Sequence, residues 1–263
     1  MTIIDSIIAF VISVIASTVG AICGVGGGIV IKPVFDFFGL ADVTVASFLS
    51  SSAVLAMSCY SVIRSFKSEI KIDLKISTPL AAGAAAGGIL GSLLFKLVRS
   101  LFENPNTVGL TQAICLGLIT TLTLAYTVFK DRMPSLKVKG ALPCLSIGLL
   151  LGVTSSFLGI GGGPINLVVL YFFFGMDTKT AAANSLYIIL FSQTANLTTT
   201  LIGGAPEVKW HALLFMISGG ILGAVIGKRI NRKLESKSVD RLFIAFMSLV
   251  IFISIYNALK FVL

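Results

Sequence analysis

The sequence contains few charged residues. Of its 263 residues, 20 are Lys or Arg and 11 are Asp or Glu, so 12% are charged, against roughly 25% in a typical soluble domain. By contrast, 56% of the residues are hydrophobic and the mean hydropathy is +1.01. A soluble fold of this size could not hide so much apolar surface. The composition therefore excludes an ordinary soluble protein and predicts that lipid surrounds most of the chain.

Residues that build metal, redox or catalytic sites are also scarce. His211 is the only histidine, and Cys23, Cys59, Cys115 and Cys144 are far apart with no C-x-x-C spacing. This pattern argues against a metal site or a disulfide framework, and we interpret all four cysteines as small core residues. A membrane-embedded enzyme would need clustered His, Cys, Asp or Glu side chains within the apolar runs, and the sequence has no such cluster. We therefore expect no catalytic residues, no metal and no cofactor.

The net charge of +9 does not indicate a nucleic-acid partner. The Lys and Arg residues lie between apolar runs, as in loops held near anionic lipid headgroups. The opening residues, Met1 to Asp5, lack the basic start of a signal peptide. We therefore interpret the first apolar segment as part of the mature structure.

Charge-free runs predict the membrane spans, at about 20 residues for each helix. The runs are Ser6–Ile31, Val43–Ile63, Ile76–Phe95, Asn104–Phe129, Gly140–Met176, Thr180–Pro206, Trp210–Gly227 and Leu242–Leu259. The fifth is too long for one pass, and both it and the first contain a Gly-x-Gly-Gly-Gly cluster. Each cluster is predicted to break a helical hairpin, with short helices at about Ile29–Phe38 and Pro164–Gly175. The predicted fold is thus an all-α polytopic membrane protein with about 8–10 transmembrane helices.

The basic residues of the loops predict the orientation. Stretches 64–75, 130–139 and 228–241 are rich in Lys and Arg, whereas 96–107 and 203–209 are poor. The positive-inside rule places the three rich stretches in the cytoplasm. Both termini are then expected outside, provided that each broken hairpin returns to the side from which it came.

The two halves of the chain resemble each other. Gly24–Gly28 matches Gly159–Gly163 at an offset of 135 residues (24 to 159), and the same offset pairs Asp42 with Asp177, Ala46 with Ala181, and Ser50 with Ser185. Further on, Glu69–Asp73 matches Glu207–His211, and Gly87–Gly91 matches Gly219–Gly223. We therefore predict two transmembrane repeats, residues 1–131 and 132–263.

Five helical pieces in each repeat imply that the second repeat is inverted relative to the first. The loop charges agree, because each rich loop in one half corresponds to a poor loop in the other. Inverted repeats with broken helices are typical of secondary transporters, whose binding site lies near the membrane midplane. The alternative is a duplicated membrane scaffold that transports nothing.

The paired Gly-x-Gly-Gly-Gly segments, each followed by a short apolar helix and an Ala/Ser/Asn-rich helix, resemble the TauE/SafE family of sulfite exporters (TSUP anion permeases). The resemblance covers essentially the whole chain. It implies a small multi-pass permease of the plasma (inner) membrane for sulfite, sulfonates or related organosulfur anions. The two short helices differ in charge, because the first carries Lys32 and Asp36, whereas the second has Asn166 and Leu170 at comparable places.

The glycine clusters are the first candidate substrate-binding residues. A helix N-terminus carries free N–H groups and roughly half a positive charge, and glycine lets an oxyanion approach the backbone closely. The candidates are Gly24, Gly26, Gly27, Gly28, Gly159, Gly161, Gly162 and Gly163. Close helix packing is the alternative role, and we assign that role to Gly87–Gly88 and Gly219–Gly220. If the clusters bind substrate, Gly27→Leu or Gly162→Leu should stop anion movement without preventing membrane insertion.

Polar side chains within the spans are further candidates, because buried polar groups in a membrane need partners. They are Ser50, Ser51, Ser52, Asn166, Asn184, Ser185, Gln193 and Asn196. They can donate hydrogen bonds to an anion or join helices to one another. His211, beside Trp210, is interpreted as an interfacial anchor rather than a proton relay.

Lys32 lies in the first short helix, four residues after Gly28. It can attract an anion, be neutralised by Asp36 one turn away, or extend to a lipid headgroup. The function predicted from the sequence is a secondary transporter that moves a small anion across the bilayer by alternating access. A passive anion channel is the main alternative, no nucleic acid is expected as a partner, and a homo-oligomer is compatible with the sequence.

Overall fold

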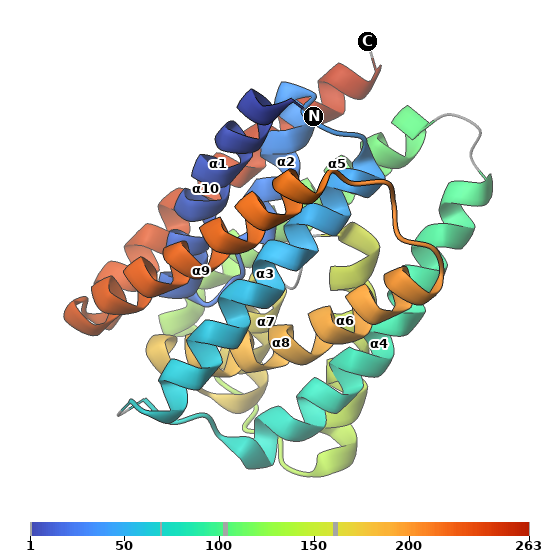
Figure 1. The fold of residues 1–263 in the computed structure, drawn as a ribbon. Coiled ribbons are helices and arrows are strands. Elements are labelled where there is room, and N and C mark those ends of the chain that lie inside the picture. Colours follow the sequence, from blue (N-terminus) through green and yellow to red (C-terminus); the bar gives the residue numbers. More distant parts are fainter. Residues whose placement is uncertain (1, 69, 102–104, 160–162, 263) are drawn as a thin grey trace.

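The computed structural model describes residues 2–68, 70–101, 105–159 and 163–262. Within these residues the chain is all-helical, as predicted, with one short 3-10 turn at Lys130–Arg132 (Figure 1). The helices are α1 (Ile3–Cys23), α2 (Gly28–Phe38), α3 (Val43–Phe66), α4 (Leu74–Leu101), α5 (Pro105–Phe129), α6 (Ala141–Leu158), α7 (Pro164–Phe174), α8 (Thr178–Ile202), α9 (Trp210–Lys233) and α10 (Ser236–Val262).

Seven of the described helices, α1, α3, α4, α5, α6, α9 and α10, are long and apolar enough to cross a membrane. The protein is thus a multi-pass membrane protein. Helix α8 has 25 residues but a more polar sequence, and most of its first half is buried among the other helices. Several helices extend beyond the charge-free runs, because helices continue past the apolar layer into charged ends.

The two glycine clusters interrupt the helices where the sequence predicts. Gly24 (φ 80°) ends α1, and Gly159 (φ 65°) ends α6. Both residues adopt the left-handed conformation that glycine favours at helix ends. The helices that follow, α2 and α7, have 11 residues each, which is too short to span a bilayer.

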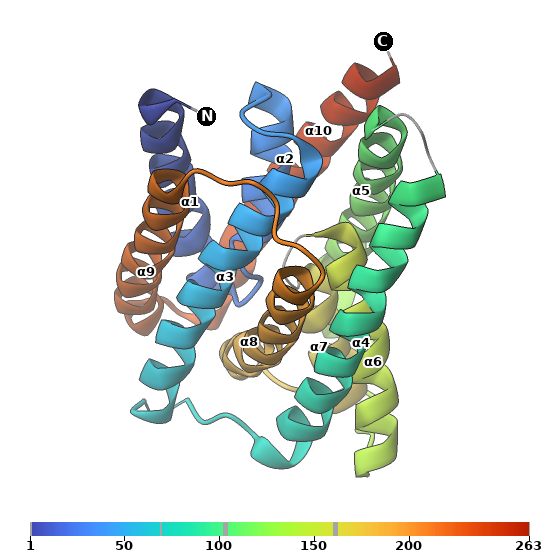
Figure 2. The same cartoon turned by 45° about the vertical axis from the view of Figure 1, so that its right-hand side comes forward.

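Equivalent helices of the two halves make equivalent contacts. Helix α1 packs on α9 as α6 packs on α4, and α3 packs on α9 as α8 packs on α4. Figure 2 shows the α1/α9 and α4/α6 pairs on either side of α3 and α8. In both halves an aspartate caps the third helix. Asp42 Oδ1 accepts hydrogen bonds from the backbone of Thr44 and Val45, and Asp177 Oδ1 accepts them from Lys179 and Thr180. These features support the predicted duplication.

The three basic loop stretches lie at one end of the molecule. Lys130 pairs with Asp240 at 2.7 Å, and Lys228 Nζ donates to Ser65 Oγ at 3.0 Å, which joins stretches 64–75, 130–139 and 228–241. We call this the basic end. Both chain termini lie at the opposite end, the terminal end (Figures 1 and 2). The arrangement is the one that the positive-inside rule requires.

The short helices α2 and α7 finish at opposite ends. The last turn of α2 lies at the terminal end, where Lys260 donates to the carbonyl groups of Asp36 and Phe37. The last turn of α7 lies at the basic end, where its carbonyl groups accept hydrogen bonds from Leu136 and Val138. The two short helices therefore end at opposite ends of the molecule, and the inversion of one repeat relative to the other stays a prediction.

Glycines bring the outer helix pairs into close contact, as predicted for Gly87–Gly88 and Gly219–Gly220. A Cβ atom on Gly87 would lie 2.1 Å from the carbonyl oxygen of Leu149 in α6. In the other half, a Cβ on Gly223 would lie 2.6 Å from the carbonyl oxygen of Val14 in α1. Such spacing requires glycine, and it matches the small-residue contacts of membrane helices.

The interpretation of the cysteines needs one correction. Cys23 and Cys144 are buried and Cys115 is partly buried, but Cys59 is exposed on α3. In a membrane protein an apolar residue on the outside faces lipid, so an apolar run does not imply a place in the core.

Candidate functional site

The first glycine cluster is packed tightly against its own protein. A Cβ on Gly24 would lie 2.3 Å from Cα of Ala182 in α8, and the Gly24 carbonyl accepts a 2.6 Å hydrogen bond from Ser185 Oγ. A Cβ on Gly27 would lie 3.0 Å from both the backbone nitrogen and Oγ of Ser17. Close packing therefore explains Gly24 and Gly27, and the hydroxyl of Ser185 joins α8 to the first interruption.

Because of this packing, the predicted Gly27→Leu variant cannot test anion binding separately from folding. A leucine at Gly27 would collide with α1, so Gly27→Leu is expected to disturb the fold as well as any anion site. Gly28 is the first residue of α2, and Gly163 precedes α7; neither helix has a side-chain cap at its N-terminus. Gly26 is buried with φ 70°, whereas Gly161 and Gly162 lie outside the described residues.

Lys32 connects the two interruptions. Its side chain is only 3% exposed, and its ammonium group donates to Gln112 Oε1 and, at 3.2 Å, to the carbonyl oxygen of Leu158. Gln112 in turn donates to the carbonyl oxygen of Phe157 at 2.7 Å. Lys32 is therefore hydrogen-bonded to α5 and the end of α6 and not to Asp36, although the Asp36 carboxyl group lies close enough to interact with its charge.

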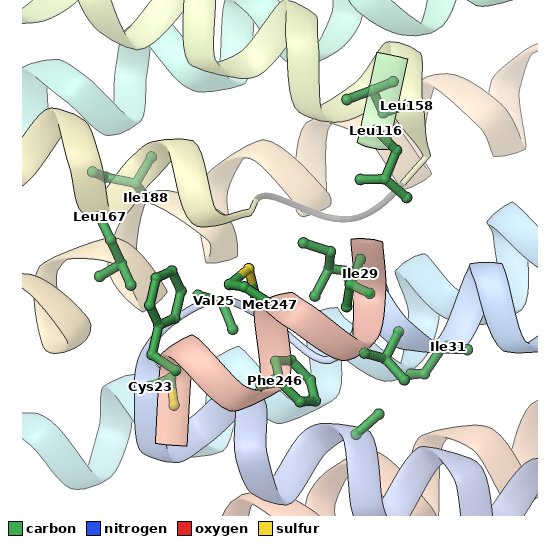
Figure 3. Close-up of a cluster of buried hydrophobic side chains, with 14 of the residues drawn as sticks. Cys23, Val25, Ile29, Ile31, Leu116, Leu158, Leu167, Ile188, Phe246 and Met247 are labelled. Carbon is green, nitrogen blue, oxygen red and sulfur yellow. The ribbon is translucent and has the colours of Figure 1, made fainter. Parts of the chain in front are cut away.

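Hydrophobic contacts also join the two interruptions. Val25 and Ile29 belong to the same buried cluster as Leu158, at the end of α6, and Leu167 in α7 (Figure 3). The second interruption therefore begins within the same core as the first, deep inside the helix bundle.

A cavity of about 160 Å³ opens beside Gly159 toward the terminal end, and we call it the terminal cavity. It lies between α3, α4, α8 and the end of α6. Its polar and charged lining residues are Thr44, Ser47, Ser51, Ser92, Lys96, Arg99, Gln112, Ser156, Asn196 and Thr200. Of the residues predicted from the sequence, Ser51, Asn196 and Gly159 line it directly, and Lys32 lies behind Gln112.

Several hydroxyl groups of this cavity lack a partner among the described residues. They belong to Thr44, Ser47 and Ser156. Ser51 accepts a long 3.4 Å contact from Asn196. Buried polar atoms in a membrane protein usually have partners, so these oxygens and the amide are suited to a ligand. The charged lining residues that the structure describes, Lys96 and Arg99, are both cationic, which favours an anion.

The polar surface continues inward along α8 and α3. Gln193 is fully buried, and neither its amide nitrogen nor its amide oxygen has a partner in the described part of the chain. It lies one helical turn before Leu197, which lines the terminal cavity. Ser50, next to Ser51, is likewise buried without a partner there. Asn166 is buried within α7.

Asn184, a predicted substrate contact, is hydrogen-bonded to other parts of the protein. Its Oδ1 accepts hydrogen bonds from the backbone of Asp73 at 2.8 Å and from Ser77 Oγ at 2.5 Å, and its Nδ2 donates to the Thr180 carbonyl at 2.7 Å. The amide thus ties α8 to the start of α4, and a substrate would have to compete with these contacts.

We expect Asn184→Ala to lower stability and leave anion affinity unchanged. The variant leaves the Asp73 N–H and the Ser77 hydroxyl without their acceptor, which costs about 1–3 kcal/mol. Thermal unfolding in detergent and the apparent KM of anion uptake measure the two effects separately. A large rise in KM with normal stability would contradict this assignment.

The sequence indicated only part of this site. In the sequence, Lys96 and Arg99 are recognisable only as loop charges. Ser47 and Ser156 lie in runs rich in serine, so nothing distinguishes them from their neighbours. The one local signal was the spacing of Thr44, Ser47 and Ser51, which places them on one face of α3.

Comparison with known proteins agrees with this description. The family model "Sulfite exporter TauE/SafE" matches residues 9–254. The probable membrane transporter protein YunE of Bacillus subtilis (strain 168) is 26% identical over 251 residues, which cover 89% of this chain and 91% of YunE. Sulfite exporter TauE/SafE family protein 5 of Arabidopsis thaliana is 30% identical over 99 residues, 38% of this chain and 22% of that protein.

No solved structure matches the chain. The family match covers nearly every described helix, including both interruptions and the terminal cavity. The chain therefore belongs to the TauE/SafE sulfite exporter family and is a multi-pass membrane transporter.

Proposed function

We propose that the protein is a secondary transporter of small anions, specifically sulfite, sulfonates or other organosulfur anions, and that it works by alternating access in the plasma membrane. The observation that carries the proposal is the terminal cavity, with its unpartnered hydroxyl groups and its two cations. The family description supports the organosulfur class.

The chemistry of the cavity suits a tetrahedral or pyramidal oxyanion. Such an anion accepts several hydrogen bonds, and Ser47, Ser51, Ser156 and Asn196 offer hydroxyl or amide donors around one space. Hydrogen bonds to a charged acceptor are about twice as strong as those between neutral groups. Lys96 and Arg99 attract the anion at the opening of the cavity. Lys32 adds a positive charge behind Gln112, which lines the cavity.

The test uses hydroxyl groups that have no hydrogen-bond partner among the described residues. The Ser47→Ala/Ser156→Ala double variant breaks no hydrogen bond between described residues, so it should insert and fold normally. If the two hydroxyls hold the anion, the apparent KM should rise about tenfold, because hydrogen bonds to a charged group contribute about 1.5–3 kcal/mol each and part of this is replaced by water.

Uptake of radiolabelled sulfite, methanesulfonate and sulfate into proteoliposomes measures this effect. Ser248→Ala is the matched control, because Ser248 is exposed on α10 and bonds only to its own helix. Trans-stimulation by unlabelled anion distinguishes a carrier from a channel. Wild-type protein that moves none of these anions would refute the proposed function. An unchanged KM in the double variant would show that the terminal cavity does not bind the transported anion.

A further inference from the structure

A second cavity, of about 260 Å³, opens at the basic end, and we call it the basic cavity. It lies between the C-terminal ends of α1, α3 and α9 and the start of α8. The charged residues of its described lining are all cationic: Arg64, Lys179, Lys228, Arg229 and Arg232. Such a concentration of cations around a cavity favours an anionic ligand.

The two cavities are lined by equivalent positions of the two halves. At the offset of 135, Thr44, Ser47 and Phe48 of the terminal cavity correspond to Lys179, Ala182 and Ala183 of the basic cavity. In the other direction, Thr200 corresponds to Ser65, and Ser156 corresponds to Ala21. Equivalent helices of the two halves line both cavities, so the basic cavity is the counterpart of the terminal cavity.

The cavities lie at opposite ends of the same two helices. On α3, Thr44 lines the terminal cavity and Arg64 lines the basic cavity, about 30 Å apart at 1.5 Å per residue. On α8 the order is reversed, with Thr200 at the terminal cavity and Lys179 at the basic cavity. Buried apolar residues of these helices, including Ala53 and Leu186, lie between the two cavities along the chain.

One lysine occupies the same position in both cavities. The match of Gly87–Gly91 with Gly219–Gly223, an offset of 132 (87 to 219), pairs Lys96 of α4 with Lys228 of α9. Both lysines line their cavities. Lys228 Nζ donates to Ser65 Oγ at 3.0 Å, and the counterpart of Ser65, Thr200, lines the cavity that contains Lys96.

We propose that the basic cavity is a second binding site for the transported oxyanion, the entrance from the basic end, and that Lys96 and Lys228 are equivalent anion-contacting residues at the two entrances. The inference rests on the proposed function. Alternating access requires a path for the anion from each side of the membrane to the central helices. The two similar halves of the chain provide one cavity on each side. An anionic lipid headgroup has similar chemistry, so the test separates it from the soluble anion.

The experiment measures anion binding at each entrance separately. In a background with the four native cysteines replaced by serine, Ser68→Cys reports on the basic cavity and Thr200→Cys on the terminal cavity, because both positions line them. We expect methanesulfonate to slow the reaction of each thiol with a membrane-impermeant maleimide in proteoliposomes of neutral phosphatidylcholine.

Lys228→Gln should raise the methanesulfonate concentration that gives half protection about tenfold for the Ser68→Cys reporter. For the Thr200→Cys reporter this concentration should change by less than twofold. Lys96→Gln should have the reverse effects. Lys233→Gln is the control, because Lys233 is exposed at the same end of α9 but does not line the cavity. The reciprocal pattern also rules out a general loss of folding, which would affect both reporters.

Three results would overturn the inference. Protection of only the terminal reporter by methanesulfonate would refute the second site and leave the proposed function standing. Equal effects of Lys228→Gln and Lys233→Gln would mean that Lys228 acts only as a surface charge. Protection of the basic reporter by added phosphatidylglycerol and not by methanesulfonate would assign the cavity to a lipid headgroup.

Discussion

Lys32→Met is expected to reduce anion transport by tenfold or more in a protein that still folds. Lys32 is a buried cation whose ammonium group contacts Gln112 and the Leu158 carbonyl, and Gln112 lines the terminal cavity. A unit charge about 8 Å from an anion contributes about 2 kcal/mol at an effective dielectric constant of about 20, which is roughly a thirtyfold change in affinity. Uptake at subsaturating sulfite measures the loss.

Gln112→Glu provides the stricter form of this test. It keeps an acceptor for Lys32 and nearly the same shape, but it loses the donor to the Phe157 carbonyl and adds a negative charge beside the cavity. We expect it to impair transport about as strongly as Lys32→Met. Lys260→Met is the control, because Lys260 is exposed and bonds to backbone carbonyls at the far end of α2. Normal transport by Gln112→Glu would mean that the charge of Lys32 serves only to hold α2 in place.

Gly87→Val is expected to produce the largest loss of stability. Its Cβ would lie 2.1 Å from the Leu149 carbonyl oxygen, a backbone atom that cannot move alone. Helices α4 and α6 would have to separate, which also disturbs Gly148, where a Cβ would meet the Leu80 carbonyl oxygen at 2.1 Å. Overpacking typically costs 1–3 kcal/mol and occasionally more, so we expect the unfolding temperature to fall by roughly 5–10 °C.

Thermal unfolding in detergent, followed by the fluorescence of the single tryptophan, Trp210, measures this change. Gly117→Ala is the matched control, because Gly117 also lies in a membrane-spanning helix but its Cβ would have an ordinary 3.6 Å contact with Ser254. If Gly87→Val and Gly117→Ala unfold at the same temperature, the close approach of α4 and α6 does not hold the fold together.

The interruptions could be recognised from the sequence because their cause is local. Gly24 and Gly159 end helices in a conformation that other residues avoid, and Asp42 and Asp177 cap helices through their nearest neighbours along the chain. The position of the three basic stretches at one end also agrees with the loop charges in the sequence, and their cytoplasmic orientation stays a prediction. Such features depend on a few consecutive residues, and the sequence displays them directly.

The roles of single polar residues depended on contacts between distant segments. Ser50 and Ser185 are equivalent in the two halves, yet Ser185 bonds to the Gly24 carbonyl and Ser50 has no partner among the described residues. Whether such a serine forms an internal hydrogen bond depends on which segment packs beside it. In the same way, the hydrogen-bond partner of Lys32 is Gln112, 80 residues away, and not Asp36 on the next turn.

The sequence by itself determined that this is a helical membrane protein of two similar halves, with two broken helices and its basic loops at one end. Apolar length, glycine conformation and loop charge are properties of short segments, and lipid acts on each segment separately. Only the tertiary structure decided which buried hydroxyl groups lack a partner among the described residues, where the cavities lie, and that Lys96 and Lys228 line one cavity each. A cavity is what the packing of several helices leaves unfilled, so no single segment contains it.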